Sequence, residues 1–499
     1  MSVKNRTAIG LLLLTVVGVC AMFGVLLGSG DENTILWTLV LALGLICGGL
    51  LLYSLKASWL NGEAFQPSVG IALVTFLGYG LGALHARYGV VSTAHGPVDP
   101  LPGLVMGLIA TICFSLGYLL PFGRNVDGAA LARWWPAWST RSAFAAGLFL
   151  IGVGAIATAY YFANGEYFAY STSDLLEQEF STVSYFRELL FVGLTIAAIS
   201  AYGRGGTRGM RRVTLAIAAI SLAVLLPTGL RYYVLYVAAA VLLPRHFLRR
   251  RLKLWSVLVA MLLIVGIVYP IGEMYRRQYQ SQAVGSQSFS EATAGVMNEL
   301  TTAGPGGYID FTFGPALGRV DLATPLAALQ TVVPNMIDYQ WGASFLPALL
   351  LWIPRFIWTD KPFYQYDNLL GRAEGLINPN DFRTSIKYSY VGELFLDFGW
   401  AGVVLGMVLY GLLFRLLFQF TTRRQHPIGI LIYSVSLVTL WTVESALGPQ
   451  LGRIVRDLIT ALVVLWIFGA FRSVLDPANR SAMSPNTGAG LSGVPATID

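Results

Sequence analysis

The run ASFLPALLLWIPRFIW, residues 343–358, decides the fold, because the orientation of everything after it depends on whether it crosses a membrane. It is apolar but only 16 residues long, and Pro347 and Pro354 interrupt it. A spanning helix needs about 20 residues. If the run crossed, the basic pair Arg423 and Arg424 would face outward, against the charge pattern of the other connections. The run is therefore predicted to dip into the membrane and return, or to lie along the outer interface. Irregular backbone at membrane depth is stable only where protein covers it or where it lines a water-filled cavity.

The composition indicates an integral membrane protein. Of the 499 residues, 55% are hydrophobic and 12% are charged, whereas a soluble protein carries about 25% charged residues. Cys20, Cys47 and Cys113 fall inside apolar runs, so neither a disulfide framework nor a metal site is expected. The four histidines lack ligand spacing, and the net charge of +7 is interpreted as a topology signal rather than a nucleic-acid surface. No metal, cofactor or nucleic-acid partner is predicted.

Twelve apolar segments are expected to form transmembrane helices. Ten runs are long enough to cross: 8–28, 34–54, 68–86, 102–121, 143–164, 186–202, 252–271, 398–420, 428–444 and 457–473. The shorter runs 213–228 and 232–244 form a pair. The first run is kept as a span, because its apolar core is too long for a signal peptide and no clear cleavage site follows. The predicted fold class is an all-α polytopic membrane protein of about twelve helices, with spans one to nine in 1–271 and ten to twelve in 398–475.

The distribution of Lys and Arg predicts the orientation. With the amino end cytoplasmic, every short basic connection falls on the cytoplasmic side, and more than half of the 33 Lys and Arg residues lie there. Both termini are then cytoplasmic. The long connection 272–397 faces outward and is expected to contain short non-spanning helices, including the re-entrant or interfacial run near 343–358. The Ser-, Pro- and Gly-rich tail 476–499 is predicted to be disordered.

The short pair 213–228 and 232–244 places an arginine at depth. Thirteen helical residues reach about 20 Å, against about 30 Å of hydrocarbon, so the turn LPTGLRYY with Arg231 should lie below the outer surface. A charge there costs roughly 2.5–3.5 kcal/mol on insertion scales and usually marks a functional site. The alternative is an arginine that reaches out to the lipid headgroups.

The outer connection combines cations with aromatic residues. It carries eight cations and twelve carboxylates, so it is not simply a basic patch. The cations beside apolar or aromatic neighbours are Arg276, Arg277, Arg319, Arg355 and Lys361. Guanidinium groups bind phosphate oxygens in pairs, and an ammonium acts as a mobile point charge, so together they would suit a lipid pyrophosphate. Ion pairs are the alternative, because Asp321 could hold Arg319 and Asp360 could hold Lys361.

Carboxylates and aromatic rings supply the other candidate residues. Glu393 and Asp397, in VGELFLDFGW, share one helical face, and either could take a proton from an attacking sugar hydroxyl. The alternative is that they stabilise a helix N-terminus. Glu444 and Arg453 are expected nearby as supporting partners. Among the aromatic residues of the loop, Tyr364 and Tyr366 are candidates for sugar stacking, although an interfacial aromatic belt has the same composition.

Three stretches resemble a known family. WIPRFIWTDKP, with GELFLDFGWAGVVLGMVLYGLL after it and LPTGLRYYVLY before it, looks like the Wzy-type O-antigen polymerases, also called oligosaccharide repeat unit polymerases. The likeness covers roughly the second half of the chain. The first six spans match the family only in being hydrophobic.

The resemblance implies a glycosyltransferase of the bacterial inner membrane, related to the multi-span GT-C enzymes and independent of metal. Such an enzyme moves a growing glycan from undecaprenyl pyrophosphate to the non-reducing end of the next lipid-linked repeat unit, in O-antigen or related polysaccharide synthesis, with its active site facing the periplasm. The resemblance also implies that Arg231, Arg319, Arg355 and Lys361 belong to a polar cavity. Its partners would be the lipid-linked donor and acceptor, membrane lipid and a chain-length regulator protein.

Two other functions are kept as alternatives. O-antigen ligases usually carry a histidine in their large periplasmic loop, and residues 272–397 contain none, which favours a polymerase. A flippase or transporter of lipid-linked oligosaccharides would also fit twelve spans. Transporters built from repeats have matching halves, however, and one outer connection of this length breaks the symmetry. A non-catalytic assembly component would not explain buried arginines.

Overall fold

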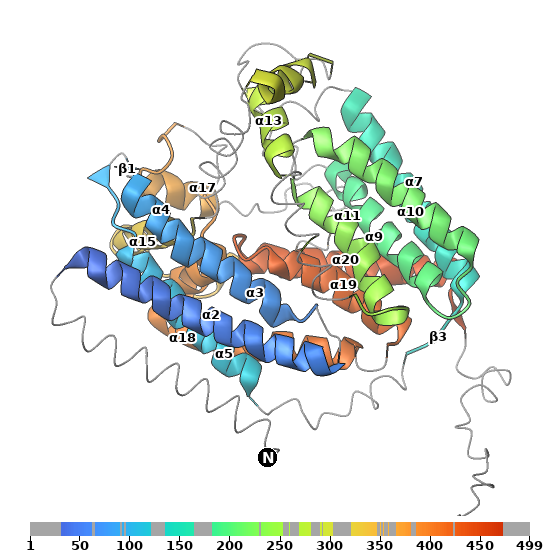
Figure 1. Ribbon diagram of the computed structural model, residues 1–499, viewed down its shortest axis with the longest axis horizontal. Coiled ribbons are helices and arrows are strands. Elements are labelled where there is room, and N and C mark those ends of the chain that lie inside the picture. The colour runs from blue at the N-terminus through green and yellow to red at the C-terminus, as the bar shows by residue number, and fades with distance from the viewer. Residues whose placement is uncertain are drawn as a thin grey trace, which may run out of the picture.

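Helices make up nearly all of the chain that the structure describes (Figure 1). The structure is a computed structural model, and it describes residues 31–61, 65–89, 92–93, 96–120, 135–163, 182–228, 231–252, 259, 269–280, 290–291, 293–302, 321–346, 350, 353, 358, 366–380, 386–422 and 425–472. Within these ranges the strands are two-residue pairs, β1 (Ser92–Thr93) with β2 (Gly96–Pro97) and β3 (Ala137–Trp138) with β4 (Phe471–Arg472). The prediction of an all-α protein is confirmed.

The described helices, in chain order, are labelled α for α-helices and η for short π- or 3-10 helices. They are α2 (Glu32–Asn61), α3 (Pro67–Thr75), the π-helical η1 (Phe76–Leu81), α4 (Gly82–Gly89), α5 (Leu101–Leu119), α7 (Thr140–Ala163), α9 (Thr182–Tyr202), α10 (Arg208–Leu225), η2 (Leu226–Thr228), α11 (Arg231–Leu248), α13 (Tyr269–Gln280), α15 (Ala323–Val332), η4 (Ala343–Phe345), α17 (Tyr366–Ala373), α18 (Ser389–Thr422), α19 (Pro427–Trp441) and α20 (Leu447–Ile467).

Six segments of the described helices are long and apolar enough to cross a membrane. They are Glu32–Tyr53, Pro67–Gly89, Leu101–Leu119, Thr140–Ala163, Tyr185–Tyr202 and Ser389–Thr422. Shorter apolar helices occupy Tyr233–Leu248 and Pro427–Trp441. A membrane protein is supported at this level, whereas the count of twelve spans stays a prediction. The expected spans 8–28 and most of 252–271, and the tail 476–499, lie outside the described residues.

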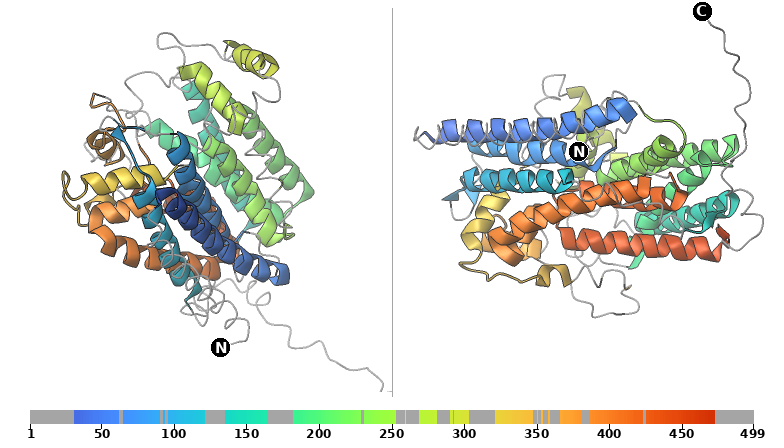
Figure 2. Two further views of the ribbon diagram at one scale, coloured as in Figure 1. Left: turned by 60° about the vertical axis from the view of Figure 1, so that its left-hand side comes forward. Right: turned by 90° about the horizontal axis from the view of Figure 1, so that it is seen from below.

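The helices form two groups that α19 and α20 join (Figures 1 and 2). One group packs α2 to α5, α15, α17 and α18 around a core that includes Tyr79, Phe114 and Tyr410. The other packs α7, α9, α10 and α11, with α19 and α20 against it. Each group buries its own apolar core, and the two joining helices therefore contact residues of both.

Small residues allow the helix backbones to approach closely. A Cβ on Gly117 of α5 would lie 1.9 Å from the carbonyl oxygen of Val408 in α18. A Cβ on Gly411 of α18 would lie 2.1 Å from the carbonyl oxygen of Phe114 in α5. Packing of this kind is typical of helices in lipid, where van der Waals contact replaces the hydrophobic drive between helices.

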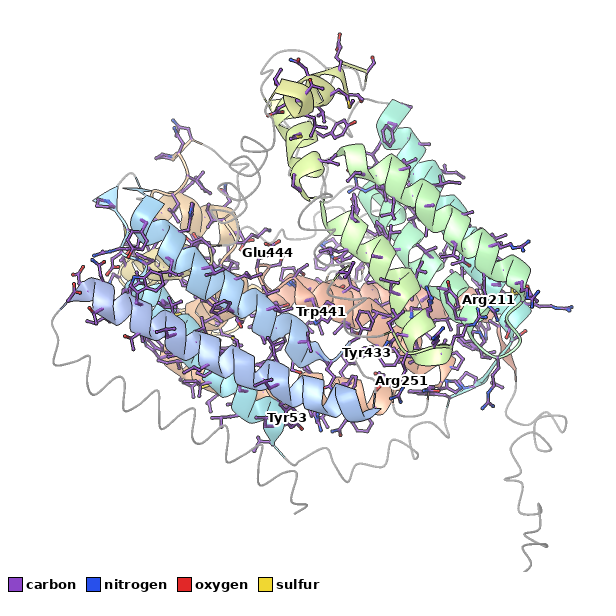
Figure 3. All side chains as sticks on the ribbon, in the orientation of Figure 1. Tyr53, Arg211, Arg251, Tyr433, Trp441 and Glu444 are labelled. Atoms are coloured by element: carbon purple, nitrogen blue, oxygen red, sulfur yellow. The ribbon has the colours of Figure 1, made fainter. Side chains whose placement is uncertain are left out.

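The basic connections meet at one end of the molecule. There β3 pairs with β4, which brings the connection before α7 to the end of α20. The rings of Trp135 and His426 lie 5.1 Å apart, so the connection between α18 and α19 lies at the same end. Figure 3 shows Arg211 and Arg251 on this side of the molecule as well. The described basic connections therefore share one end of the molecule, and the assignment of that end to the cytoplasm stays a prediction.

The opposite end carries the short helices of the long connection. The amide of Leu322, just before α15, donates to the carbonyl of Gly78, and the amide of Ser389 donates to the carbonyl of Glu444. Only the first residues of the run 343–358 form a described segment, and they make the single turn η4. Most of the rest of the run lies outside the described residues, so its non-spanning path stays a prediction.

Several helices have other bounds than the sequence predicted. α18 begins at Ser389 rather than 398, and α20 begins at Leu447 rather than 457. α10 and α11 have 18 residues each, about 27 Å at 1.5 Å per residue, so the premise of two short helices is wrong. Apolar runs stop at the first charge, whereas the helices continue wherever neighbouring groups satisfy that charge.

Candidate functional site

Glu393 and Asp397 lie one turn apart in α18, and both are buried. The hydroxyl of Ser344, in η4, lies 3.3 Å from Oε1 of Glu393 and also within hydrogen-bonding distance of Oδ2 of Asp397. A serine hydroxyl has one proton to donate. Ser344 therefore bridges the two carboxyl groups but donates to one of them at a time.

Asp397 holds in place the turn that leads into η4 and includes it. Its Oδ1 accepts hydrogen bonds from the amide of Gly342 at 3.0 Å and from the amide of Ser344 at 3.4 Å. The carbonyls of Leu396 and Asp397 accept from the amides of Gln340 and Trp341, both at 3.1 Å. Side chain and backbone together hold residues 340–345 (the 340–345 turn) against α18.

A break in α18 makes these backbone contacts available. Gly399 has φ 59° and ψ −149°, so the helix is interrupted directly after the two carboxylates. The carbonyls just before the break lose their helical partners and need other donors. The amides of the 340–345 turn supply them, which is why the break and the turn occur together.

Glu393 connects α18 to the start of α20. Its Oε2 accepts a hydrogen bond of 2.9 Å from the amide of Gly448, in the first turn of α20. Amides of a first turn have no partner inside the helix, and the helix dipole favours a negative charge there. The alternative role of Glu393, stabilisation of a helix N-terminus, therefore applies to α20. It does not apply to α18, which has no acidic residue in its own first turn.

A second polar cluster lies further along α20 and faces α9 and α11. Arg456 contacts the carboxylates of Glu188 and Asp457, the latter at 2.8 Å. The Nη1 atom of Arg453 lies 3.8 Å from Oε1 of Glu188 and 3.4 Å from the hydroxyl of Tyr236. Two guanidinium groups and two carboxylates thus meet inside the helical bundle, and their formal charges sum to zero.

Pairing explains why these charges are tolerated at this depth. The side chains of Arg456 and Glu188 are 15% and 13% exposed. Removing one partner of such a pair leaves an uncompensated buried charge and typically costs about 3–5 kcal/mol. Ionisable residues inside a membrane protein usually face a cavity and mark a functional site.

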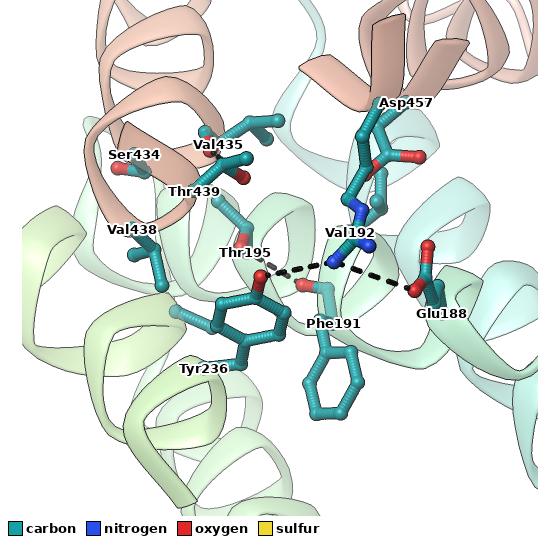
Figure 4. A pocket seen from close by; sticks show the side chains of 12 residues that line it. Glu188, Phe191, Val192, Thr195, Tyr236, Ser434, Val435, Val438, Thr439 and Asp457 are labelled. Atoms are coloured by element: carbon teal, nitrogen blue, oxygen red, sulfur yellow. Dashed lines mark hydrogen bonds and ion pairs between the residues drawn. The ribbon is translucent and has the colours of Figure 1, made fainter. Parts of the chain in front are cut away.

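A cavity adjoins this cluster between α9, α11, α19 and α20 (Figure 4). It has about 430 Å³ of space free of atoms, part of which is open to solvent. The polar residues that line it are Glu188, Thr195, Tyr236, Ser434, Thr439, Arg453 and Asp457. Valine, alanine and Phe191 complete the wall. The lining therefore mixes donors, acceptors and apolar surface.

The clusters around Glu393 and Arg453 lie on the same stretch of α20. Five residues separate Gly448 from Arg453, about 7.5 Å along a helix. Between them, Oε1 of Gln450 lies 2.9 Å from the hydroxyl of Tyr390 in α18. The first turns of α20 therefore connect the carboxylates of α18 with the charged cluster and its cavity.

The structure describes only part of the predicted pyrophosphate site. Arg231 begins α11, and Arg276 and Arg277 lie in α13, but their side chains are outside the described residues. Arg319, Arg355, Lys361 and Tyr364 also lie outside them.

Other predicted residues are described. The hydroxyl of Tyr366 donates to Oε1 of Gln340 at 3.1 Å, which places this candidate sugar-binding residue beside the 340–345 turn. Glu444 is exposed in the connection between α19 and α20, and Arg453 belongs to the charged cluster. Asp321, weighed as a partner for Arg319, accepts hydrogen bonds from the amides at the start of α15. These residues keep their predicted roles as hypotheses.

Four residues of the charged cluster were not predicted from the sequence: Glu188, Tyr236, Arg456 and Asp457. The signal for three of them was present, because RIVRD (453–457) and FREL (186–189) put charges next to long apolar runs. Glu188 and Asp457 lie in the first residues of the predicted spans 186–202 and 457–473, and Arg456 lies just before the second, so none of them was considered as a charge inside the bundle. Tyr236 carries no such signal, since its role depends on the helix that packs against it.

The chain matches no protein-family model, no curated protein and no solved structure.

Proposed function

We propose that the chain is a membrane glycosyltransferase that polymerises oligosaccharide repeat units carried on undecaprenyl pyrophosphate. The reaction would take place on the periplasmic side of the bacterial inner membrane, in O-antigen or related surface polysaccharide synthesis. The basis is the resemblance of three stretches to the Wzy-type polymerases, together with the surroundings of one of them.

The observation that carries the proposal concerns residues 392–400, GELFLDFGW. In this stretch two buried carboxylates lie directly before the break of α18 and contact the 340–345 turn. Broken helices and non-spanning segments at membrane depth occur where the chain lines a cavity or is covered by protein. A site of this kind suits a reaction at the membrane surface between two lipid-linked substrates.

In the proposed reaction a hydroxyl of the acceptor sugar attacks the anomeric carbon of the donor glycan. The bond from that carbon to the pyrophosphate oxygen breaks, and undecaprenyl pyrophosphate leaves. Glu393 or Asp397 takes the proton of the hydroxyl, while the predicted cations stabilise the charge that develops on the leaving group. Both carboxyl groups are covered by the 340–345 turn, so this turn has to move before a sugar hydroxyl can reach either of them.

A transporter of lipid-linked oligosaccharides is the second candidate, and the charged cluster of α9 and α20 favours it. Paired Arg, Glu and Asp residues inside a helical bundle are typical of substrate and ion pathways. The two functions differ in outcome, because only the polymerase forms a glycosidic bond.

The deciding experiment uses the purified protein in liposomes with lipid-linked repeat units from the organism that makes them. A polymerase should release undecaprenyl pyrophosphate and give glycans of two or more repeats on one lipid. Movement of the lipid-linked unit across the bilayer without any longer glycan would contradict the polymerase and support the transporter. Deletion of the gene should leave a surface glycan of a single repeat.

Variants of the two carboxylates test the chemistry. If Glu393 is the base, Glu393→Gln should lower the rate of chain extension by about 100-fold or more, the usual contribution of general base catalysis. Asp397→Asn tests the alternative. Asp338→Asn is the control, because this carboxylate is exposed near the same turn and contacts neither group. Full activity of both site variants would show that the carboxylates only fix the turn.

A further inference from the structure

The cavity between α9, α11, α19 and α20 is not used by the proposed chemistry, although polar side chains form much of its wall. Its wall supplies a carboxylate from Glu188, a guanidinium from Arg453 and hydroxyls from Tyr236 and Ser434. These groups come from four different helices, so the site exists only in the folded protein.

The charge of the cavity favours an uncharged ligand. Glu188 and Asp457 balance Arg453 and Arg456, so a phosphate would add negative charge beside two carboxylates. Arg187, which neighbours Glu188 in the chain, does not line the cavity. Its guanidinium lies over the rings of Tyr161 and Tyr233. A neutral ligand that both donates and accepts hydrogen bonds avoids this conflict.

The polar groups retain capacity for hydrogen bonds with such a ligand. The side chain of Arg453 is 38% exposed, and a guanidinium has five N–H donors. Its contacts to Glu188 and Tyr236 are long, at 3.8 and 3.4 Å. The hydroxyl of Ser434 is buried and has no hydrogen-bond partner among the described residues. A buried hydroxyl without a partner costs free energy unless a ligand or water satisfies it.

Apolar side chains complete the wall of the cavity. Phe191 packs edge to face with Tyr236, with ring centroids 5.3 Å apart and planes at 75°, and Val435 and Val438 also line the cavity. The C–H groups of a sugar ring need apolar surface, and its hydroxyl groups need hydrogen-bond donors and acceptors. A wall that supplies both matches a sugar.

We propose that this cavity binds one sugar ring of the lipid-linked glycan, held by Glu188, Arg453, Tyr236 and Ser434. The identity of the glycan rests on the proposed function, whereas the site itself rests on the cavity. Tyr236 lies five residues after Arg231, about 7.5 Å along α11. A sugar close to a pyrophosphate at the start of α11 would therefore lie near the cavity.

The test uses the free oligosaccharide repeat unit, released from its lipid by mild acid, so that neither lipid nor pyrophosphate contributes. Its affinity for the protein in lipid nanodiscs is measured by saturation-transfer NMR titration. Tyr236→Phe and Ser434→Ala should each weaken binding about 2- to 10-fold, the share of one hydrogen bond. Tyr233→Phe and Ser436→Ala are matched controls on the same two helices, since neither residue lines the cavity, and they should bind like the wild type.

Three results would overturn the sugar site. In the first, the free oligosaccharide does not bind. In the second, the cavity variants and their controls change its binding equally, and in the third, inorganic pyrophosphate binds and the same cavity variants weaken that binding. Chain extension by the wild-type protein is measured in parallel. Extension without sugar binding at the cavity refutes the sugar site and leaves the polymerase. Cavity-dependent binding without extension refutes the polymerase and leaves the sugar site.

Discussion

Glu374 has a buried carboxyl group in the described part of the long connection. It is buried just after α17, and its Oε2 accepts a hydrogen bond of 2.6 Å from the hydroxyl of Tyr388. Its Oε1 has no hydrogen-bond partner among the described residues. Burial raises the pKa of Glu374 to about 9, since the charged form loses its hydration. The folded protein therefore holds this group protonated at neutral pH.

This raised pKa predicts how stability depends on pH. The unfolded chain loses the proton near pH 4.5, whereas the folded protein keeps it until about pH 9. The contribution of Glu374 to stability is therefore complete below pH 4.5 and falls as the pH rises towards 9. In Glu374→Gln an amide replaces the protonated acid, so this loss should disappear. We expect the variant to have a higher melting temperature than the wild type at pH 8, by roughly 2 °C or more, and a smaller difference at pH 5.

Glu444→Gln is the control for that measurement, because Glu444 is exposed. It removes one carboxyl group without relieving any burial, so its melting temperature should follow the wild type at both pH values. A Glu374→Gln curve parallel to the wild type would mean that Glu374 ionises as readily in the folded as in the unfolded chain.

Sequence reasoning located some residues of the site and missed others for a physical reason. Glu393 and Asp397 were found because spacing along one helix can be read directly from the sequence. Glu188 and Arg456 lie on helices far apart in the chain, and each looks unfavourable until its partner is known. The pattern of one sequence shows which charges a helix carries, but it does not show which other helix supplies the opposite charge.

At the scale of elements, the break in α18 depends on one glycine. The backbone angles of Gly399 belong to a region that is open almost only to glycine, and a residue forced into it costs about 1–3 kcal/mol. A Cβ at this position would also lie 2.9 Å from the hydroxyl oxygen of Tyr339. Nothing in the period of the apolar residues indicates this break, and the predicted span 398–420 runs through Gly399 without interruption.

Gly399→Ala should therefore lower the stability of the protein and disturb the 340–345 turn. We expect a lower melting temperature and, if the function is as proposed, slower chain extension. Gly152→Ala is the matched control, because Gly152 lies inside α7 with open space around it. Alanine is the better helix former there, so that variant should be as stable as the wild type or more stable. Equal stability of both variants would show that the chain can continue α18 without the break.

At the scale of the whole molecule, periodicity and charge predicted more than local spacing did. The apolar runs located most described helices, since a bilayer demands long uninterrupted stretches of backbone bonded to itself. The helix ends were the weakest part of the prediction, because α18 and α20 continue outward through buried, paired charges. The sidedness of the connections came from Lys and Arg alone, and contacts at one end of the bundle agree with it.

Those contacts make a prediction about the run 343–358. The hydroxyl of Thr140 donates to the carbonyl of Arg204 at 2.8 Å, and the rings of Trp135 and His426 lie 5.1 Å apart. The connections before α10 and before α19 thus belong to one end of the molecule. These two connections can share a side of the membrane only if the chain between them crosses it an even number of times. The predicted crossings are α10, α11, the run 252–271 and α18, which is an even number as long as the run 343–358 does not cross.

Single cysteines in a protein whose native cysteines are replaced by serine can test this sidedness. Met336, Arg204 and Gln425 are all exposed, so each tolerates the change and remains open to reagent. A maleimide that cannot cross membranes should label Met336→Cys in intact spheroplasts. It should label Arg204→Cys and Gln425→Cys only after the membrane is opened, since both belong to the predicted cytoplasmic side. Labelling of Gln425→Cys in intact spheroplasts, with Arg204→Cys protected, would mean that the run 343–358 crosses the membrane after all.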